Sequence, residues 1–126
     1  MKLVLDSGAL IALERNDRAM WRRLKAAHLA GNIPVSHGGA VGQAWRGRGP
    51  RRALLAKALD AVEIRPLDAA LGRAAGELLA AAGKRDVIDA ALVLLAADGD
   101  DIVTSDPDDL EPLALASGRH VELIRT

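Results

Sequence analysis

Short apolar runs alternate along this chain with longer segments rich in alanine and leucine. The short runs, among them KLVL and DIVT, are bounded by Gly, Pro or Asp, as strands usually are. They predict strands at residues 2–5, 33–36, 62–66, 101–104 and 120–124. In the longer segments, apolar positions recur at helical spacing. They predict helices at about residues 8–14, 18–30, 39–46, 51–59, 69–82, 87–97 and 108–116.

The alternation of strands and helices predicts an α/β fold, because each parallel strand is joined to the next by a crossover that usually contains a helix. We expect a central parallel sheet of four to five strands flanked by helices, in a single domain spanning residues 1–126. This length is sufficient to bury one hydrophobic core. No repeat, low-complexity tract or linker divides the chain.

The composition narrows the possible function classes. The chain has no Cys, which excludes disulfides, a thiolate zinc site and a thiol nucleophile. Its apolar stretches are too short for a membrane span and its start does not resemble a signal peptide, so we expect a cytoplasmic protein with no membrane partner. Phe and Tyr are absent, which argues against binding of nucleic acid by repeated base stacking. Contacts with nucleic acid would depend on phosphate.

The charges are unevenly distributed, although 17 basic and 17 acidic side chains balance overall. Residues 86–118 contain nine acids and no Lys or Arg. Asp86 and Asp89 lie about one turn apart on the same face of a predicted helix. Asp6 and Asp106 each lie just past the end of a predicted strand, where the ligand sites of open α/β sheets gather. Clustered carboxylates repel one another unless a cation neutralises them, and oxygen ligands suit Mg²⁺ or Mn²⁺.

Each acid also has a simpler interpretation. Asp6, Asp86 and Asp106 all precede predicted helices and could act only as helix caps. Asp89 could be an ordinary charge on an exposed helix face. Three further acids precede the fourth strand and are expected to form a solvated turn: Asp98, Asp100 and Asp101. The combination of acids, rather than any single one, favours a metal site.

Three segments resemble the PIN-domain ribonucleases, and within them the toxins of VapBC-type toxin–antitoxin systems. LDSGALIAL resembles the opening strand and helix of that family, DVIDAALVLLA its late acidic helix, and IVTSDPDDL its Thr-x-Asp strand end. The order and separation of the three segments are more specific than any one of them. The resemblance implies a PIN-like three-layer fold.

The resemblance also implies an activity. Asp6, Asp86 and Asp106 correspond to acids of the family's metal pocket, with Asp89 adjacent, and the metal would be Mg²⁺ or Mn²⁺. The implied function is that of a metal-dependent endoribonuclease, the toxin of a type II pair, which hydrolyses RNA phosphodiester bonds with water and leaves a 5′-phosphate and a 3′-hydroxyl. A cognate antitoxin protein and a homodimer are the partners that the family implies.

One residue departs from the family pattern. Gln43, within VGQAWR, stands where the family usually has Glu. An amide oxygen can accept a hydrogen bond but carries no negative charge, so a second cation would be held less firmly. Asp89, and after it Asp109, could compensate in part. The alternative is therefore a PIN-like module that binds RNA or antitoxin and has weak or no nuclease activity.

The basic residues Arg46, Arg48, Arg51 and Arg52 occur in a segment without acids. This segment predicts an RNA-binding patch that contacts phosphates on either side of the cleaved bond. A solvated helix face, or a dock for an acidic partner, explains the same residues. Trp45 beside them could pack in the core, which is the default expectation for a lone Trp, or form part of a partner-binding groove.

Other residues favour other chemistry less. The three His, at positions 28, 37 and 120, show no spacing typical of metal ligands. Ser7 next to Asp6 lacks a nucleophile elbow, so a Ser hydrolase is not indicated. A flavodoxin-like signalling domain with an Asp cluster for Mg²⁺ is a third hypothesis. The absence of a suitably placed Lys after a late strand argues against it.

Overall fold

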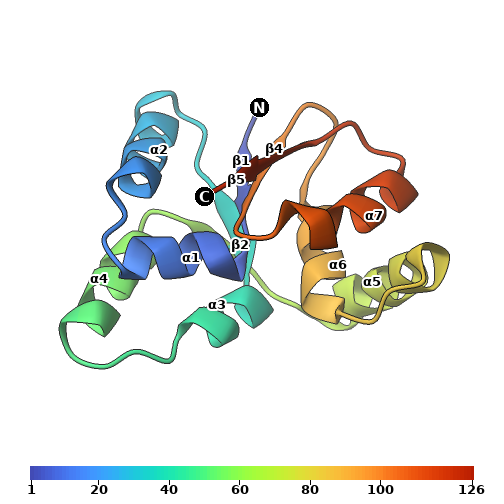
Figure 1. Cartoon of the computed structure of the whole chain (residues 1–126), viewed down its shortest axis with the longest axis horizontal. Helices are drawn as coiled ribbons and strands as arrows, with labels where there is room; N and C mark the ends of the chain where they lie inside the picture. The colour runs from blue at the N-terminus through green and yellow to red at the C-terminus, as the bar shows by residue number, and fades with distance from the viewer.

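The computed structural model describes residues 1–126 and contains one sheet of five strands with helices on both faces (Figure 1). The strands are β1 (Leu3–Leu5), β2 (Val35–His37), β3 (Glu63–Arg65), β4 (Asp101–Thr104) and β5 (Glu122–Arg125). The helices are α1 (Ser7–Glu14), α2 (Arg18–Leu29), α3 (Gly38–Ala44), α4 (Pro50–Leu59), α5 (Ala69–Ala82), α6 (Val87–Leu95) and α7 (Pro107–Ser117). The predicted α/β class is confirmed, as are all the predicted strands and helices, with shifts of a few residues at their ends.

All strand pairs are parallel, and the strand order across the sheet is β3-β2-β1-β4-β5. Val4 of β1 lies beside Val35 on one side and Ile102 on the other. The order of the strands reverses between β1 and β4, which is the place where open α/β sheets form ligand crevices outside their carboxyl ends. Asp6 follows β1 and Asp106 lies two residues after β4, so both acids lie beyond the carboxyl ends of the two strands at this switch point, where a ligand crevice is expected.

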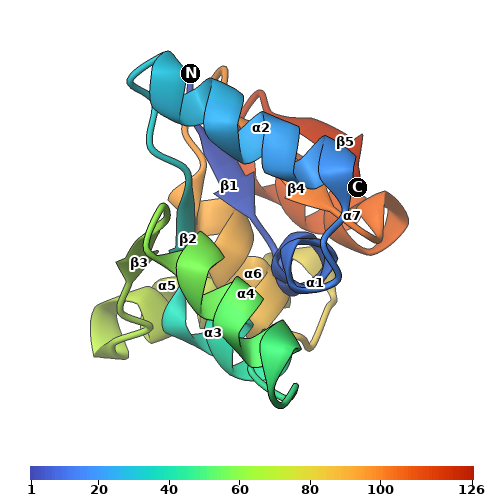
Figure 2. The same cartoon turned by 90° about the vertical axis from the view of Figure 1, so that its left-hand side faces the viewer.

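Successive residues of β1 pack on opposite faces of the sheet. Leu3 and Leu5 belong to a core formed with α1, α2, α3 and α4, whereas Val4 belongs to a second core formed with α5, α6 and α7. In Figure 2 the first four helices lie in front of the sheet and the last three behind it. Burial on both faces explains why the central strands are continuously apolar, as parallel strands usually are. The three layers are consistent with the expected PIN-like arrangement.

The start of α1 packs directly against the residue that follows β4. A Cβ atom added to Gly8 would lie 2.0 Å from Oγ of Ser105. No side chain fits at this position unless Ser105 moves, so glycine permits the close approach. This contact holds the segment after β1 beside the segment after β4, and these segments carry Asp6 and Asp106.

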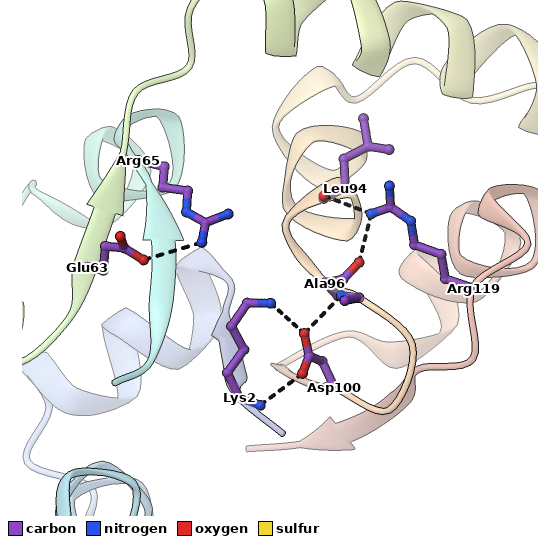
Figure 3. Close-up of polar contacts among 8 residues, drawn as sticks. Lys2, Glu63, Arg65, Leu94, Ala96, Asp100 and Arg119 are labelled. Carbon is purple, nitrogen blue, oxygen red and sulfur yellow. Dashed lines mark hydrogen bonds and ion pairs between the residues drawn. The ribbon is translucent and has the colours of Figure 1, made fainter. Parts of the chain in front are cut away.

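The turn before β4 differs from its prediction. Asp100 is buried, with 6% of its surface exposed, and its carboxylate accepts hydrogen bonds from the ammonium and backbone N–H of Lys2 and from the N–H of Ala97 (Figure 3). Burial acts to raise the pKa of Asp100, but the hydrogen bonds from Lys2 and Ala97 and the charge of Lys2 together outweigh it and hold the pKa below its ordinary value. The prediction of a solvated turn is wrong for Asp100, because this acid fastens the start of β1 to the turn.

The neighbouring Arg119 closes the carboxyl end of α6. Its guanidinium donates hydrogen bonds to the carbonyl oxygens of Leu94 at 2.8 Å and Ala96 at 2.7 Å (Figure 3). These carbonyls lie at the helix end, where intrahelical partners are missing. Arg119 and Asp100 therefore stabilise the edge of the sheet opposite the crevice. None of the helices is both long and apolar enough to cross a membrane.

Candidate metal centre

Three of the predicted site acids begin helices. Oδ1 of Asp6 accepts a hydrogen bond from the backbone N–H of Ala9 at 2.8 Å, and Oδ1 of Asp86 accepts one from Ile88 at 2.9 Å. Asp106 caps α7 in the same way, with a longer contact of 3.4 Å. The capping interpretation is therefore confirmed for all three acids. Each of these bonds uses one carboxylate oxygen, so capping leaves a second oxygen for another ligand.

A cavity of about 210 Å³ opens between the start of α6 and the start of α7. Two of the predicted metal ligands, Asp86 and Asp89, line it together with Asp109, which was also expected to compensate in part for Gln43. The residues around the cavity are Lys84, Arg85, Asp86, Asp89, Asp109 and Leu113. The ion pairs of the structure join Lys2 to Asp100 and Arg65 to Glu63, so no cation of the chain pairs with these acids.

The environment of Asp89 shows that several acids lie close enough to affect its ionisation. Burial raises its pKa most, and the charges of Asp86, Asp6 and Asp109 raise it further, to about 6. Asp6 does not line the cavity, yet its charge reaches the Asp89 carboxylate. Because like charges that cannot be solvated separately favour the protonated form, Asp89 holds a proton well above the pH at which an isolated Asp loses it. Asp89 is therefore not an ordinary surface charge.

Asp6 is the most buried of the predicted ligands, with 8% of its surface exposed. Burial raises the pKa of its carboxyl group, whereas the Thr104 hydroxyl and the N–H of Ala9 lower it and leave a net rise. The same Thr104 oxygen accepts a hydrogen bond from the backbone N–H of Asp106 at 2.9 Å. Thr104 thus connects the two strand ends. The sequence identified it only as part of the Thr-x-Asp segment.

Asp106 and Asp109 form a second acidic pair at the start of α7. The pKa of Asp109 is raised mainly by its hydrogen bond with the Asp106 side chain and by the charge of Asp106, while the charge of Lys84 lowers it. Asp109 therefore extends the row of carboxylates that begins at Asp6. The sequence indicated Asp109 only as a second possible compensation for Gln43, whereas in the structure it lines the cavity.

The acids fit a divalent cation by their chemistry. They are oxygen donors, neighbouring acids contribute to the raised pKa values of Asp89 and Asp109, and no ion pair neutralises them. In the conformation described, however, no group of three or more Asp, Glu or His side chains is arranged to hold one metal ion. Asp6, Asp86 and Asp106 each keep one carboxylate oxygen in a helix cap, so only the rest of each carboxylate is available to another ligand.

Two further polar residues, Gln43 and Glu14, lie near α3 and outside the cavity. Gln43 lies in the last turn of α3, half-buried, and does not line the cavity. Glu14 at the end of α1 is buried, and its Oε2 has no hydrogen-bond partner. A Cβ atom on Gly47 would lie 2.7 Å from that oxygen. Nothing in the sequence pattern indicated that Glu14 is buried.

The predicted basic patch is exposed. Its members, Arg46, Arg48, Arg51 and Arg52, lie in the connection from α3 to α4 and in the first turn of α4, and none forms an ion pair. Trp45 is 38% exposed, and the Arg52 guanidinium carbon lies 5.2 Å from the centre of its ring. The prediction of a core Trp is wrong, because α3 ends at Ala44 and Trp45 belongs to the connection. Figure 1 shows α3 at the same end of the sheet as the starts of α1 and α6.

Comparisons with known proteins add no assignment: no family model matches this chain, and no curated protein matches it. The residues at the crevice are therefore the basis for assigning a function.

Proposed function

We propose that this chain is a metal-dependent endoribonuclease of the PIN type and acts in the cytoplasm as the toxin of a type II toxin–antitoxin pair. The observation that supports the proposal best is the environment of Asp89. Burial raises its pKa most, and acids from the end of β1, the start of α6 and the start of α7 raise it further, to about 6. Strongly perturbed carboxylates at the switch point of an α/β sheet are typical of catalytic sites.

The proposed metal ligands are Asp6, Asp86, Asp89 and Asp106. Asp86 and Asp89 lie one turn apart on α6, and Asp6 and Asp106 follow adjacent strands. A divalent cation among them would remove the repulsion that raises the pKa of Asp89. Carboxylates of this kind select Mg²⁺ or Mn²⁺ over softer metals.

The ion and the acidic side chains would contribute different parts of the hydrolysis. A bound Mg²⁺ or Mn²⁺ supplies a water of lowered pKa and polarises a phosphoryl oxygen. Asp89 would hold the ion together with the other acids, and the proton that it keeps below a pH of about 6 in the metal-free protein would leave as the ion binds. Asp6, held by Thr104 and Ala9, keeps one carboxylate fixed at the crevice. Hydrolysis by water needs no protein nucleophile.

The basic patch supports RNA as the substrate. Arg46, Arg48, Arg51 and Arg52 are exposed and have no acidic partner of their own. Guanidinium groups bind phosphate through paired N–H donors. RNA phosphates along α3 would connect this patch with the acids at the start of α6.

The same acids suit a protein partner. A guanidinium is a bidentate match for clustered carboxylates, so an antitoxin that places an Arg among Asp86, Asp89 and Asp109 would neutralise the site. A homodimer of the chain belongs to the same proposal.

A second candidate function is supported by Gln43. Gln43 supplies no charge and does not line the cavity, and no group of three acids is arranged to hold an ion. The chain would then be a PIN-like module that binds RNA or an antitoxin and cleaves weakly or not at all.

Cleavage assays separate the two candidates. We expect the purified protein with Mn²⁺ to cut single-stranded or structured RNA, Asp86→Asn to abolish the cleavage, and Asp60→Asn to leave it intact. Asn still caps a helix, so Asp86→Asn removes charge and preserves the start of α6. Asp60 is an exposed acid at the end of α4 and serves as the matched control. Cleavage that persists in Asp86→Asn contradicts the proposal, and RNA binding without cleavage supports the second candidate.

A further inference from the structure

His37, the last residue of β2, uses both of its ring nitrogens inside the protein. Its side chain is fully buried. Nδ1 accepts hydrogen bonds from the backbone N–H groups of Gly39 at 3.0 Å and Ala40 at 3.3 Å, which caps α3. Nε2 lies 2.9 Å from the carbonyl oxygen of Ile88. Because a carbonyl oxygen only accepts, the proton of the neutral ring must be on Nε2.

Ile88 lies between Asp86 and Asp89 in the first turn of α6. Its backbone N–H donates to the Asp86 carboxylate, and its carbonyl oxygen accepts from His37. The peptide groups on both sides of Ile88 are therefore held. One of these bonds involves a proposed metal ligand, and the other connects the turn to β2.

The starts of α3 and α6 are also in tight contact. A Cβ atom on Gly39 would lie 2.4 Å from Cδ1 of Ile88 and 2.9 Å from Cε1 of His37. The two helices thus meet with no space for a larger residue at Gly39. The imidazole lies at the same contact, against Gly39 and hydrogen-bonded to Ile88.

We propose that His37 is a positioning residue for the candidate metal centre: its imidazole fixes the first turn of α6, and with it the carboxylates of Asp86 and Asp89, relative to the sheet edge that carries Asp6. This inference rests on the proposed function, since it concerns the affinity of that site for a cation. His37 acts through the Ile88 carbonyl and does not touch the ion.

The surroundings of His37 keep it neutral. Burial lowers the pKa of the imidazole, and the hydrogen bond to Ile88 raises it by less. No charged side chain contributes to the shift. A neutral ring is required because a protonated Nδ1 could not accept the N–H groups of Gly39 and Ala40.

Two substitutions separate the two roles of the ring. In His37→Asn the amide oxygen occupies the place of Nδ1 and still caps α3, but nothing reaches Ile88. In His37→Gln the amide nitrogen occupies the place of Nε2 and can donate to Ile88, but the cap is lost. A lost cap lowers the stability of the helix and of the whole protein. We therefore expect His37→Gln to be the less stable variant and His37→Asn to be the weaker cation binder.

The test is calorimetric titration of metal-free protein with Mn²⁺, with thermal unfolding measured on the same samples. We expect His37→Asn to bind Mn²⁺ roughly tenfold more weakly than wild type, as is common when a group that orients metal ligands is lost, and His37→Gln to bind nearly as wild type does. Asp86→Asn is the control for loss of the site. A purely structural role would make affinity follow stability, which is the opposite order.

Each other outcome is also decisive. Equal affinity of wild type and His37→Asn overturns the positioning role and leaves the metal centre intact. Absence of Mn²⁺ binding by wild type overturns both. Should His37→Asn fail to fold, Gly39→Ala displaces Ile88 instead and is expected to weaken Mn²⁺ binding similarly. Hydrogen exchange of the Asp89 amide, measured without metal, should be faster in His37→Asn than in His37→Gln, and equal rates contradict the inference.

Discussion

The carboxylates of Asp6 and Asp89, one following the first strand and the other in the sixth helix, interact electrostatically across the crevice of the sheet. Burial makes the largest contribution to the raised pKa of Asp89, and the charges of Asp86 and Asp6 add to it. The interaction depends on the strand order, because β1 and β4 are neighbours and α6 packs behind them. Without a cation, the ionised form of Asp89 is unfavourable, and this has measurable consequences.

Asp89→Asn should stabilise the metal-free protein at pH 7.5. The folded protein binds the proton of Asp89 more tightly than the unfolded chain does, so stability is present at low pH and falls as pH rises from 3.8 to about 6. The pKa shift of Asp89 corresponds to a loss of roughly 3 kcal/mol of unfolding free energy at most, and solvent screening reduces this loss to about 1–2 kcal/mol. Urea unfolding at pH 7.5 and pH 3.5 measures it.

The stabilisation by Asp89→Asn should disappear at pH 3.5, where Asp89 is protonated in both the folded and the unfolded state. Asp60→Asn provides the baseline for an exposed acid. An equal effect of Asp89→Asn at both pH values would show that packing, not charge, controls the site.

Cation binding should depend on pH in the same range. Because Asp89 is protonated below a pH of about 6, a divalent ion must displace that proton to use the carboxylate. We expect the affinity for Mn²⁺ to rise between pH 5 and pH 7, with close to one proton released per ion at the lower value, and to level off above it. Titration calorimetry in buffers of different ionisation enthalpy counts the protons, and no release at pH 5 would exclude Asp89 as a ligand.

Gln43→Glu should change the metal dependence of cleavage. The wild-type chain is expected to hold a second cation weakly and to prefer Mn²⁺ over Mg²⁺, because Gln43 contributes no charge. The added carboxylate should lower the concentration of metal needed for half-maximal cleavage. Gln43→Met keeps the length without charge and serves as the control. Identical metal dependence of wild type and Gln43→Glu would show that this position does not act on the metal.

The basic patch should control RNA affinity through salt. Replacing Arg51 and Arg52 by Gln removes two exposed guanidinium groups that form no ion pair. We expect weaker RNA binding to a single strand, and a dependence of log affinity on log salt that is shallower by about 0.7 for each phosphate that the variant no longer neutralises. Fluorescence anisotropy at several salt concentrations measures this. The matched control is Arg22→Gln with Arg23→Gln on α2, which should leave the slope unchanged.

The local pattern of the sequence was sufficient for the elements and for several site residues. β1 and β4 are apolar because both of their faces are buried, and each ends before an Asp, which placed Asp6 and Asp106 at the same edge. That placement needed only the alternation of strands and helices. The proximity of these acids then followed from the parallel arrangement of the strands.

Contacts between distant residues could not be predicted in this way. The burial of Asp100 depends on the register of β1 and β4, which brings Lys2 beside it. His37 meets the Ile88 carbonyl 51 residues later in the chain, and no periodicity indicates that contact. The pKa of Asp89 likewise depends on how α6 and α7 pack. Strand pairing and helix packing, rather than the local propensities of the residues, determine these three features.

The capping role of Asp6, Asp86 and Asp106 determines which variants can test the proposed catalysis. Alanine at Asp6, Asp86 or Asp106 would remove a helix cap and a carboxylate in the same step, at a cost of about 1 kcal/mol for the cap. Alanine scanning would therefore merge lost folding with lost chemistry into a single inactive phenotype. Asparagine keeps the cap and neutralises the charge, so a series of amide variants is the way to obtain inactive chains that still fold and can still be tested for binding to RNA and to an antitoxin.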